Sequence, residues 1–429
     1  MLRLIDLRSP RSFSGHAKPR PRASTQKTED VVKGILRRVK SEGDAAVRFY
    51  TKKFDRIELK GLSVSKREIA EALANADPRF IGILRAAARN IRRFHERQRR
   101  VSWSVKAGKG SSLRQLYLPV DRAGVYVPGG KAAYPSSVLM NVIPAQVAGV
   151  REILIVSPPD QNGRVHKDVL AAAAILGITK IFRIGGAQAI AALAYGTQTI
   201  LAVDVIVGPG NVFVAEAKKL VFGTVGIDGV AGPSEVVILA DDTARADFVA
   251  GDMLAQAEHD ESASSILVTT SDRLARGVEK ALKDSLHTLP RRAIIAGSLK
   301  RNGAIYLVKN LAQGTQLVNH LAPEHLEIVT RNDESMLKKI RHAGSIFLGS
   351  YSPVVVGDYF AGPNHVLPTN RTARFASPLS VDSFMKKSSV IKYSKGMMQS
   401  VLRSVATFAE HEGLTAHAFS ARLRAEEER

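Results

Sequence analysis

The stretch of this chain best suited to chemistry holds an amide and an imidazole three residues apart, at Gln256 and His259. Both follow an Ala-rich amphipathic segment, so the spacing predicts that they share one face at the end of a helix. An amide oxygen and an imidazole nitrogen aimed at one point can bind a metal ion or a polar ligand. A hydrogen-bonded helix end is the alternative, because this spacing also occurs by chance.

Three further clusters combine a histidine with a carboxylate. Each lies beside Gly or Pro, at a turn or an element end, where functional side chains are usually presented. We expect these clusters and the first pair to converge on one divalent metal ion and one small polar substrate. The clusters are Glu324-His325, Asp358 with His365, and Glu412 with His417.

The donor atoms available indicate the kind of metal. The chain has no cysteine, which excludes disulfides, thiolate ligands and a cysteine nucleophile. Gln256, His259, Asp358 and a second histidine would form a nitrogen and oxygen coordination sphere, which suits zinc or manganese. Without a thiol, an aldehyde could be oxidised only as its hydrate, and that route needs a general base.

Glu324 and His325 are the candidate bases. A carboxylate and an imidazole differ in resting pKa, so one could remove an alcohol proton while the other activates water. Adjacent residues of a strand point to opposite faces, so both reach one site only if the backbone turns at Pro323. A surface Glu-His pair is the alternative.

Glycine turns follow three predicted strands, at Gly129-Gly130, Gly185-Gly186 and Gly208-Pro-Gly210. At the carboxyl edge of a parallel sheet, such turns let backbone amides approach a diphosphate. None matches the GxGxxG fingerprint, and each alone is better explained as a tight turn. Three at one edge of a sheet leave a nucleotide site and simple tight turns as equal alternatives. The polar side chains beside them are Tyr126, Gln188 and Asn211.

Short apolar runs alternate with Ala-rich helical patterns from about residue 116, and the alternation restarts at Glu235. This order predicts an α/β fold with two Rossmann-like parallel-sheet units and helical N- and C-terminal segments. Helices are expected over residues 27–50 and 66–98, and a short strand at Leu2 to Ile5. The predicted segments are a mainly helical, basic 1–115, a first α/β unit 116–232, a second unit 233–377 and a helical 378–429.

The basic character is concentrated at the start of the chain. The net charge is +22, and residues 1–110 hold 28 Lys and Arg against 11 Asp and Glu. Nucleic acid is therefore a possible partner, but no RNA-binding aromatic motif, zinc finger or helix-turn-helix spacing is present, and an exposed basic face is favoured.

Transit peptides share the Arg- and Ser-rich composition of the first 28 residues, but a short strand and a basic loop are the preferred interpretation. No apolar run has the length of a membrane helix or the form of a secretory signal, so we expect a cytoplasmic protein.

The clusters, in this order, resemble the histidinol dehydrogenase family. The similar motifs extend from about residue 120 to 420. They are Val125-Tyr-Val-Pro-Gly-Gly130, Gly185-Gly-Ala-Gln-Ala-Ile190, Val207-Gly-Pro-Gly-Asn211, Gly226-Ile-Asp-Gly-Val-Ala-Gly-Pro-Ser-Glu235, Gln256-Ala-Glu-His259, Ala322-Pro-Glu-His-Leu326, Gly357-Asp-Tyr-Phe-Ala-Gly-Pro-Asn-His365 and Glu412-Gly-Leu-Thr-Ala-His417.

The resemblance implies oxidation of L-histidinol to L-histidine through the aldehyde, with two NAD+ used in succession. It implies one Zn2+, with Mn2+ as a possible substitute, on Gln256, His259, Asp358 and His417. His325 would take the alcohol proton and Glu324 would activate water. These four ligands and His325 would also hold the substrate, together with Ser234, His365 and Glu412, while Tyr126, Gln188 and Asn211 would contact NAD. It also implies a homodimer in which Glu412 and His417 could complete the partner's site.

The chain departs from the family pattern in one region. Val354 stands where an acid is usual, Asn370-Arg371 replaces a Gly-rich turn, and Pro378 replaces a glycine. No proposed ligand is affected, but the loop after His365 is expected to differ. A related zinc- and NAD-dependent dehydrogenase acting on another small alcohol, such as a sulfonated diol, is the alternative enzyme. A basic nucleic-acid-binding protein that keeps an old enzyme fold is the alternative from another class.

Overall fold

The structure is a computed structural model that describes residues 2–9, 25–129 and 133–424. Parts of three sequence predictions lie outside these ranges. They are residues 10–24 of the basic first segment, the glycine at position 130, and residues 425–429 of the predicted helical C-terminal segment.

The described chain forms two compact units. The first contains residues up to 98 together with 120–384, and the second contains 99–119 together with 385–429. This division differs from the four consecutive segments expected from the sequence, because strands distant in the chain pair with each other in the second unit.

The first unit contains a five-stranded parallel sheet. Its strand order is β6-β5-β4-β7-β8. The β-branched run Glu152 to Val156 forms the buried strand predicted there, since such side chains pack well between two layers of helices. The strands are β4 (Arg122–Tyr126), β5 (Glu152–Val156), β6 (Ile181–Phe182), β7 (Val205–Val207) and β8 (Gly226–Ile227).

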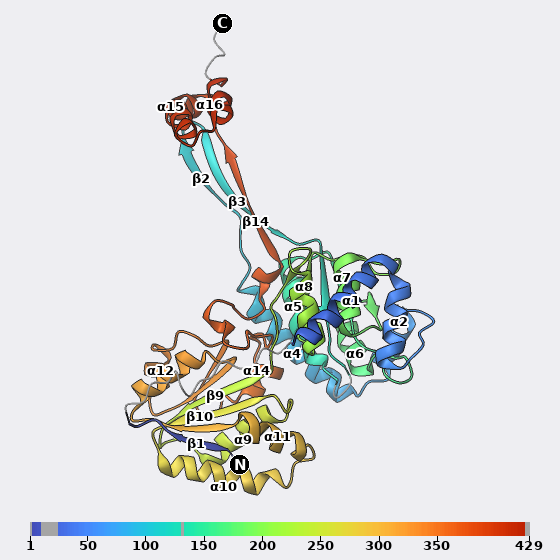
Figure 1. The fold of residues 1–429 in the computed structure, drawn as a ribbon, viewed down its shortest axis with the longest axis vertical. Helices are drawn as coiled ribbons and strands as arrows, with labels where there is room; N and C mark the ends of the chain where they lie inside the picture. The colour runs from blue at the N-terminus through green and yellow to red at the C-terminus, as the bar shows by residue number, and fades with distance from the viewer. Residues whose placement is uncertain (1, 10–24, 130–132, 425–429) are drawn as a thin grey trace. The chain divides into compact units, whose positions relative to one another are not determined.

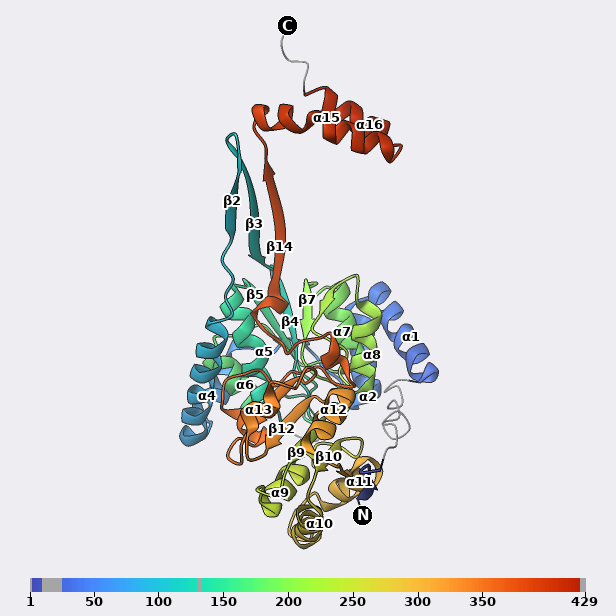
Figure 2. The ribbon, with the colours of Figure 1, turned by 90° about the vertical axis from the view of Figure 1, so that its left-hand side faces the viewer.

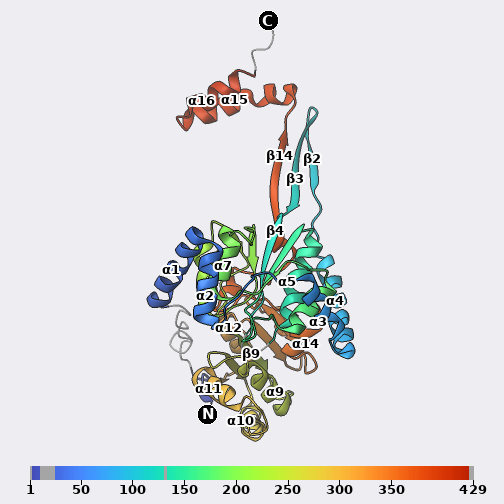
Figure 3. The ribbon, with the colours of Figure 1, turned by 90° about the vertical axis from the view of Figure 1, so that its right-hand side faces the viewer.

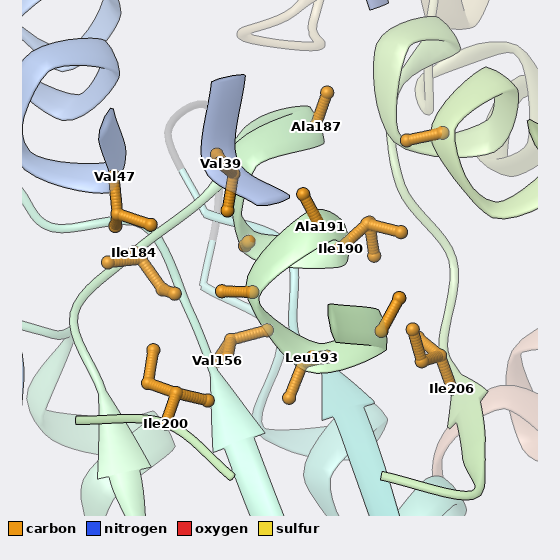
Figure 4. Close-up of a cluster of buried hydrophobic side chains, with 14 of the residues drawn as sticks. Val39, Val47, Val156, Ile184, Ala187, Ile190, Ala191, Leu193, Ile200 and Ile206 are labelled. Carbon is orange, nitrogen blue, oxygen red and sulfur yellow. The ribbon is translucent and has the colours of Figure 1, made fainter. Parts of the chain in front are cut away.

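Helices cover both faces of this sheet. Figure 2 shows α7, α8 and α1 on one side and α5 and α6 on the other. On the first side, Ile190 and Leu193 of α7 pack with Val39 of α1 and Ile206 of β7 in a buried cluster (Figure 4). The helices are α1 (Gln26–Glu42), α2 (Asp44–Asp55), α3 (Lys66–Ala74), α4 (Pro78–Glu96), α5 (Pro135–Ala148), α6 (Lys167–Ile175), α7 (Gly186–Tyr195) and α8 (Val212–Val221).

A second, six-stranded parallel sheet belongs to the same unit. Its order is β1-β11-β10-β9-β12-β13, so the predicted short N-terminal strand forms and pairs with β11. In Figure 1, α9, α10 and α11 lie on one face of the sheet and α12 on the other, and each face has its own apolar cluster. The strands are β1 (Arg3–Asp6), β9 (Glu235–Ala240), β10 (Ser264–Thr269), β11 (Ala304–Leu307), β12 (His325–Val329) and β13 (Ser345–Leu348).

The helical segments around this sheet vary in length. They are α9 (Ala246–Ala257), α10 (Asp272–Leu286), α11 (Arg292–Asn302), α12 (Leu311–Leu321), α13 (Asp333–Leu337), α14 (Val354–Tyr359) and η2 (Thr372–Arg374). The short η3 (Val381–Phe384) packs instead against α5, beside the first sheet. Numbered in chain order within each sheet, the strands of both sheets run 3-2-1-4-5, with β1 added at one edge of the second. This is the order of doubly wound nucleotide-binding sheets, and the mixed α/β class predicted from the sequence is confirmed.

The second unit is a three-stranded antiparallel sheet followed by two helices (Figure 3). It consists of β2 (Trp103–Gly108), β3 (Ser111–Pro119), β14 (Met385–Lys392), α15 (Lys395–His411) and α16 (Thr415–Arg422). The prediction of a helical segment from residue 378 is therefore wrong over β14. Its residues pair with β3 along the whole strand, from Met385 opposite Pro119 to Lys392 opposite Ser112.

Both long helices predicted near the start are broken in two. Gly43 has a φ of 58° and separates α1 from α2, while Asp77 caps a new helix that begins at Pro78. Glycine readily adopts a positive φ and proline is favoured at a helix start, so both breaks follow from residue type. Ser136 and Ser137 are residues that commonly cap a helix, but α5 already begins at Pro135 and they lie inside it.

The spacing of apolar residues in α4 predicts one buried stripe, and the structure confirms it in part. Leu84, Ala87 and Ile91 are buried as predicted, Phe80 is half-buried and Phe94 is exposed. Of the five arginines expected on the other faces, four are exposed and Arg92 is half-buried; the exposed ones are Arg85, Arg89, Arg93 and Arg97. Within the described residues, no helix combines the length and apolarity needed to cross a membrane.

Candidate active site

The two candidate bases lie at the amino edge of the second sheet. Ala322 takes a left-handed conformation, with a φ of 47°, and the chain then passes through Pro323 into β12, whose first residue is His325. His325 pairs in register with Val236 of β9, so Ser234 just before β9 lies at the same edge. The turn at Ala322 and Pro323 is the backbone bend that the sequence required.

His325 has the protonation pattern of a general base. Its Nδ1 donates to the carbonyl oxygen of Glu235 at 3.1 Å, which leaves Nε2 without a proton in the neutral ring. Nε2 is buried, has no hydrogen-bond partner among the described residues, and lies 3.8 Å from Oδ1 of Asp358. Burial lowers the pKa of His325, so the ring is neutral at neutral pH and can accept a proton.

Glu324 is buried directly beside this ring. Its Oε2 accepts a hydrogen bond from the backbone N–H of Glu235 at 2.8 Å and lies 3.6 Å from Nδ1 of His325. The two side chains therefore reach one site, as the sequence analysis required. The carboxylate approaches the protonated nitrogen of the ring and leaves Nε2 on the other side available.

Gln256 and His259 lie where α9 ends. Gln256 is in the last turn and His259 is in the turn that follows, rather than both on the helix. The amide of Gln256 is only 3% exposed, yet neither its oxygen nor its nitrogen has a hydrogen-bond partner within the described ranges. A buried amide without partners is costly, so this side chain could bind a ligand. His259 is exposed, and its Nδ1 donates to the carbonyl of Ala255 at 3.2 Å.

Asp358 lies in the short helix α14, not in the loop that was predicted, and His365 follows it. Gly357 allows this helix to approach β13 closely, since a Cβ there would lie 2.6 Å from the ring of Phe347. The Nδ1 of His365 donates to the carbonyl of Asp358 at 3.0 Å, and burial lowers the pKa of His365. Asp358, His365 and His325 line one cavity of ≈ 220 Å³.

The first unit supplies an incomplete set of metal ligands. Across residues 2–9, 25–129 and 133–424, no three His, Asp or Glu side chains are grouped closely enough to hold a metal ion by themselves. Gln256, His259 and Asp358 nevertheless offer nitrogen and oxygen donors, and the unpartnered amide of Gln256 fits such a role. These residues could hold zinc or manganese together with one more ligand.

Glu412 and His417 belong to the second unit. Glu412 follows the end of α15, Gly413 has a φ of 74°, and His417 lies in α16. Both side chains are exposed there, on either side of the glycine turn that the sequence indicated.

Tyr126, Gln188 and Asn211 lie beside the glycine turns of the first sheet. The hydroxyl of Tyr126 accepts a hydrogen bond from the N–H of Gly186 at 3.1 Å, and burial raises the pKa of Tyr126 to about 12, so the hydroxyl stays protonated. Gln188 is buried and its Oε1 has no partner among the residues that the structure describes. Asn211 is exposed, and its Oδ1 caps α8 by accepting from Phe213 and Val214.

The turns leave little space for side chains. Gly208 has a φ of 108°, and a Cβ on it would lie 2.2 Å from the carbonyl oxygen of Tyr126. A Cβ on Gly185 would lie 2.6 Å from Pro158. A turn that excludes side chains presents its backbone amides, which together with the unpartnered Gln188 fits a dinucleotide.

Some supporting residues have no signal in the sequence. Lys218 and Asp228 form a buried ion pair beside Gly208. Lys218 donates to the carbonyl of Gly208 at 3.0 Å, and the carboxylate of Asp228 accepts from the N–H of Gly208 at 2.8 Å. Asp228 lies in one of the motifs that resemble those of the family. Its partner Lys218 lies on a helix with two adjacent lysines, which the sequence alone would place on an exposed face. The side chain of Asn90 likewise donates to the carbonyl of Phe360 at 2.9 Å and so holds the loop before His365.

A family model described as histidinol dehydrogenase matches residues 18–425. The chain belongs to the histidinol dehydrogenase family. Among its relatives, the histidinol dehydrogenase of Bacillus subtilis (strain 168) is 54% identical over 402 residues, which is 94% of each chain. That of Geobacillus kaustophilus is 53% identical over 404 residues, 94% of this chain and 95% of the relative.

A crystal structure of histidinol dehydrogenase from Elizabethkingia anophelis superposes with a TM-score of 0.94 at 36% identity, covering 99% of this chain and 98% of the other. Membership of the histidinol dehydrogenase family makes this chain an oxidoreductase. It also confirms the resemblance drawn from the sequence motifs.

Proposed function

We propose that the protein oxidises L-histidinol to L-histidine, at the end of histidine biosynthesis in the cytoplasm, in two successive oxidations through L-histidinaldehyde. The observation that carries this proposal is the pair of adjacent bases, with the unprotonated Nε2 of His325 beside Asp358 and the cavity that these residues share with His365. The names of the relatives support the choice of substrate.

His325 accepts the proton of the substrate alcohol at Nε2 during the first oxidation. The hydrogen bond from Nδ1 to the Glu235 carbonyl fixes the ring and stabilises the positive charge that forms. NAD+, held by the glycine turns with Tyr126, Gln188 and Asn211, would take up the hydride in both oxidations. The products of the first step are the aldehyde, NADH and a proton.

Glu324 removes a proton from the water that adds to the aldehyde. Because the resulting hydrate carries a hydrogen on the same carbon, a second oxidation yields the carboxylate without a thiol. This agrees with a chain that contains no cysteine. His365, Ser234 and Glu412 would hold the polar groups of the substrate.

The proposed metal ion is zinc, with manganese as a substitute, held by Gln256, His259, Asp358 and His417. It would position the substrate and polarise its hydroxyl. Since the first unit supplies only three of these ligands, we propose a homodimer in which Glu412 and His417 of one chain complete the site of its partner.

Metal content measured together with the NADH yield on L-histidinol tests the proposal. We expect about one zinc per chain and two NADH for each histidinol consumed, with no aldehyde released. A reaction that stops after one NADH, or turnover of a sulfonated diol in preference to histidinol, would reject the assignment.

A further inference from the structure

Glu327 is a buried carboxyl group that the proposed reaction does not use. It lies on β12 two residues beyond His325, so both side chains point to the same face of the sheet. Its register neighbours are Ile238 on β9 and Phe347 on β13, and its own exposure is 2%. An acidic side chain in this apolar row needs a specific partner, because an isolated buried charge is costly.

Two polar contacts reach this carboxyl group. Its Oε1 accepts a hydrogen bond from the backbone N–H of Val354 at 2.9 Å. Val354 is the first residue of α14, the helix that carries Asp358. The second is the neighbouring carboxyl group of Asp252, which lines the same small cavity as Glu327 and lies close enough to raise the pKa of Glu327. Asp252 lies on α9, one turn before Gln256.

Two carboxyl groups can form a hydrogen bond only if one of them holds a proton. The second buried oxygen of Glu327, Oε2, has no hydrogen-bond partner among the described residues, so it is available for such a shared proton. Arg245 lines the same small cavity but forms an ion pair with Asp247. Burial raises the pKa of Asp252 to about 6, and burial and then the charge of Asp252 raise the pKa of Glu327.

We propose that Asp252 and Glu327 share one proton and act as a positioning pair that fixes α9, β12 and α14 against one another. These elements carry Gln256, His325 and Asp358, with His259 just beyond α9. The pair thus sets the distances between the candidate metal ligands and the general base. Its effect on metal retention rests on the proposed function, whereas the shared proton does not.

The shared proton makes a prediction for the metal-free protein. Unfolded carboxyl groups ionise near pH 4 to 4.5, roughly, while the folded pair keeps its proton to higher pH. The pair therefore stabilises the protein most below the unfolded pKa, and that contribution is lost as the pH rises through the folded pKa, about 6 for Asp252. In Glu327→Gln, the amide can donate to Asp252 and accept from Val354 without any shared proton.

We expect the melting temperature of the metal-free wild type, relative to Glu327→Gln, to fall by roughly 3 °C between pH 5 and pH 8. A difference that does not change with pH would overturn the shared proton. This measurement is independent of zinc and substrate.

Zinc dissociation into excess chelator tests the positioning role. Glu327→Ala should lose zinc about 10-fold faster than the wild type or more, and Glu327→Gln should stay within roughly twofold because it keeps both contacts. Asp241→Ala is the matched control. Asp241 is buried at the opposite edge of the same sheet and accepts from Arg331 and Thr243, so its loss should lower the melting temperature and leave zinc dissociation unchanged.

Wild-type zinc dissociation in Glu327→Ala, or equally fast loss in Glu327→Gln and Glu327→Ala, would overturn the positioning role. Failure of the wild type to take up zinc would instead reject the proposed metal site. In that case, the pH dependence of the melting temperature still decides whether the proton is shared.

Discussion

Three histidines of the candidate site share one hydrogen-bonding arrangement. His259, His325 and His365 each donate from Nδ1 to a backbone carbonyl, those of Ala255, Glu235 and Asp358. Each neutral ring therefore keeps the lone pair of Nε2, which can bind a metal ion or accept a proton. The backbone thus sets the tautomer of each of these three rings.

The first prediction separates the two bases. Glu324→Gln should retain most of the first oxidation and slow the second by about 100-fold or more, because an amide cannot remove a proton from water. With histidinol as substrate, this variant should yield about one NADH for each histidinol consumed. In a separate assay, its rate of histidinaldehyde oxidation should be close to zero.

His325→Asn is the companion variant for this experiment. It should slow the first oxidation, since the alcohol proton then has no acceptor at Nε2. Equal loss of both oxidations in Glu324→Gln would contradict the division of roles.

Site residues with a recognisable spacing or a neighbouring Gly or Pro could be predicted from the sequence, whereas isolated acids could not. Gln256 with His259 and Glu324 with His325 attract notice by spacing and by neighbouring Gly or Pro. Asp252 and Glu327 are single acids in otherwise apolar or mixed segments, and their contact joins a helix to a strand. Only the fold brings such residues together.

The glycine turn after β7 allows a prediction at the scale of the element. Gly208→Ala should raise the KM for NAD+ by about 10-fold and lower stability by about 1–3 kcal/mol. The new Cβ would meet the carbonyl of Tyr126 at 2.2 Å. Steady-state kinetics and urea unfolding would measure the two effects.

Gly223→Ala is the matched control, since Gly223 has a φ of 101° but no atom within 4 Å of a built Cβ. It should show the cost of the backbone conformation alone, with an unchanged KM for NAD+. Similar KM values in the two variants would show that the clash at Gly208 does not affect the cofactor turn.

The buried ion pair behind this turn gives a third prediction. Lys218→Met should destabilise the protein by about 3–5 kcal/mol, because it leaves Asp228 buried without its cation. Lys52→Met is the control. Lys52 and its partner Glu58 are both exposed, so the loss of this pair should cost about 1 kcal/mol or less.

Urea unfolding of both variants measures the difference. Equal destabilisation by Lys218→Met and Lys52→Met would show that the buried pair contributes no more than an exposed one.

The order of strand, turn and helix was sufficient to predict two parallel sheets, because alternating elements of that kind pack in few ways. It could not predict that β1 joins the second sheet beside β11, or that β14 pairs with β3. Pairing between distant segments leaves no local pattern. The short strand at Leu2 to Ile5 was visible, but its neighbour was not.

At the scale of the whole molecule, the proposed homodimer predicts complementation between two inactive chains. His325→Ala lacks the base and His417→Asn lacks a metal ligand, so each alone should be nearly inactive, and His417→Asn should retain less zinc. Unfolding and refolding the two together should restore about a quarter of wild-type activity, because half of the dimers are mixed and each has one intact site.

Each variant refolded alone provides the baseline for this mixture. An inactive mixture would mean that His325 and His417 act within one chain. Wild-type zinc content in His417→Asn would remove this residue from the metal site.

The two sheets share a strand order but differ at their carboxyl edges. In the first, glycine turns follow β4 and β7; in the second, the carboxylate of Asp241 bridges the ends of β9 and β12 by accepting from Arg331 and Thr243, with Asp242 beside it. Negative charge at that point would repel a diphosphate. If the protein binds a dinucleotide, the described fold therefore favours the carboxyl edge of the first sheet as its single binding site. Two successive oxidations at one such site would require NADH to dissociate and a second NAD+ to bind while the aldehyde intermediate stays bound. The residues that bind the aldehyde must therefore hold it without help from the coenzyme.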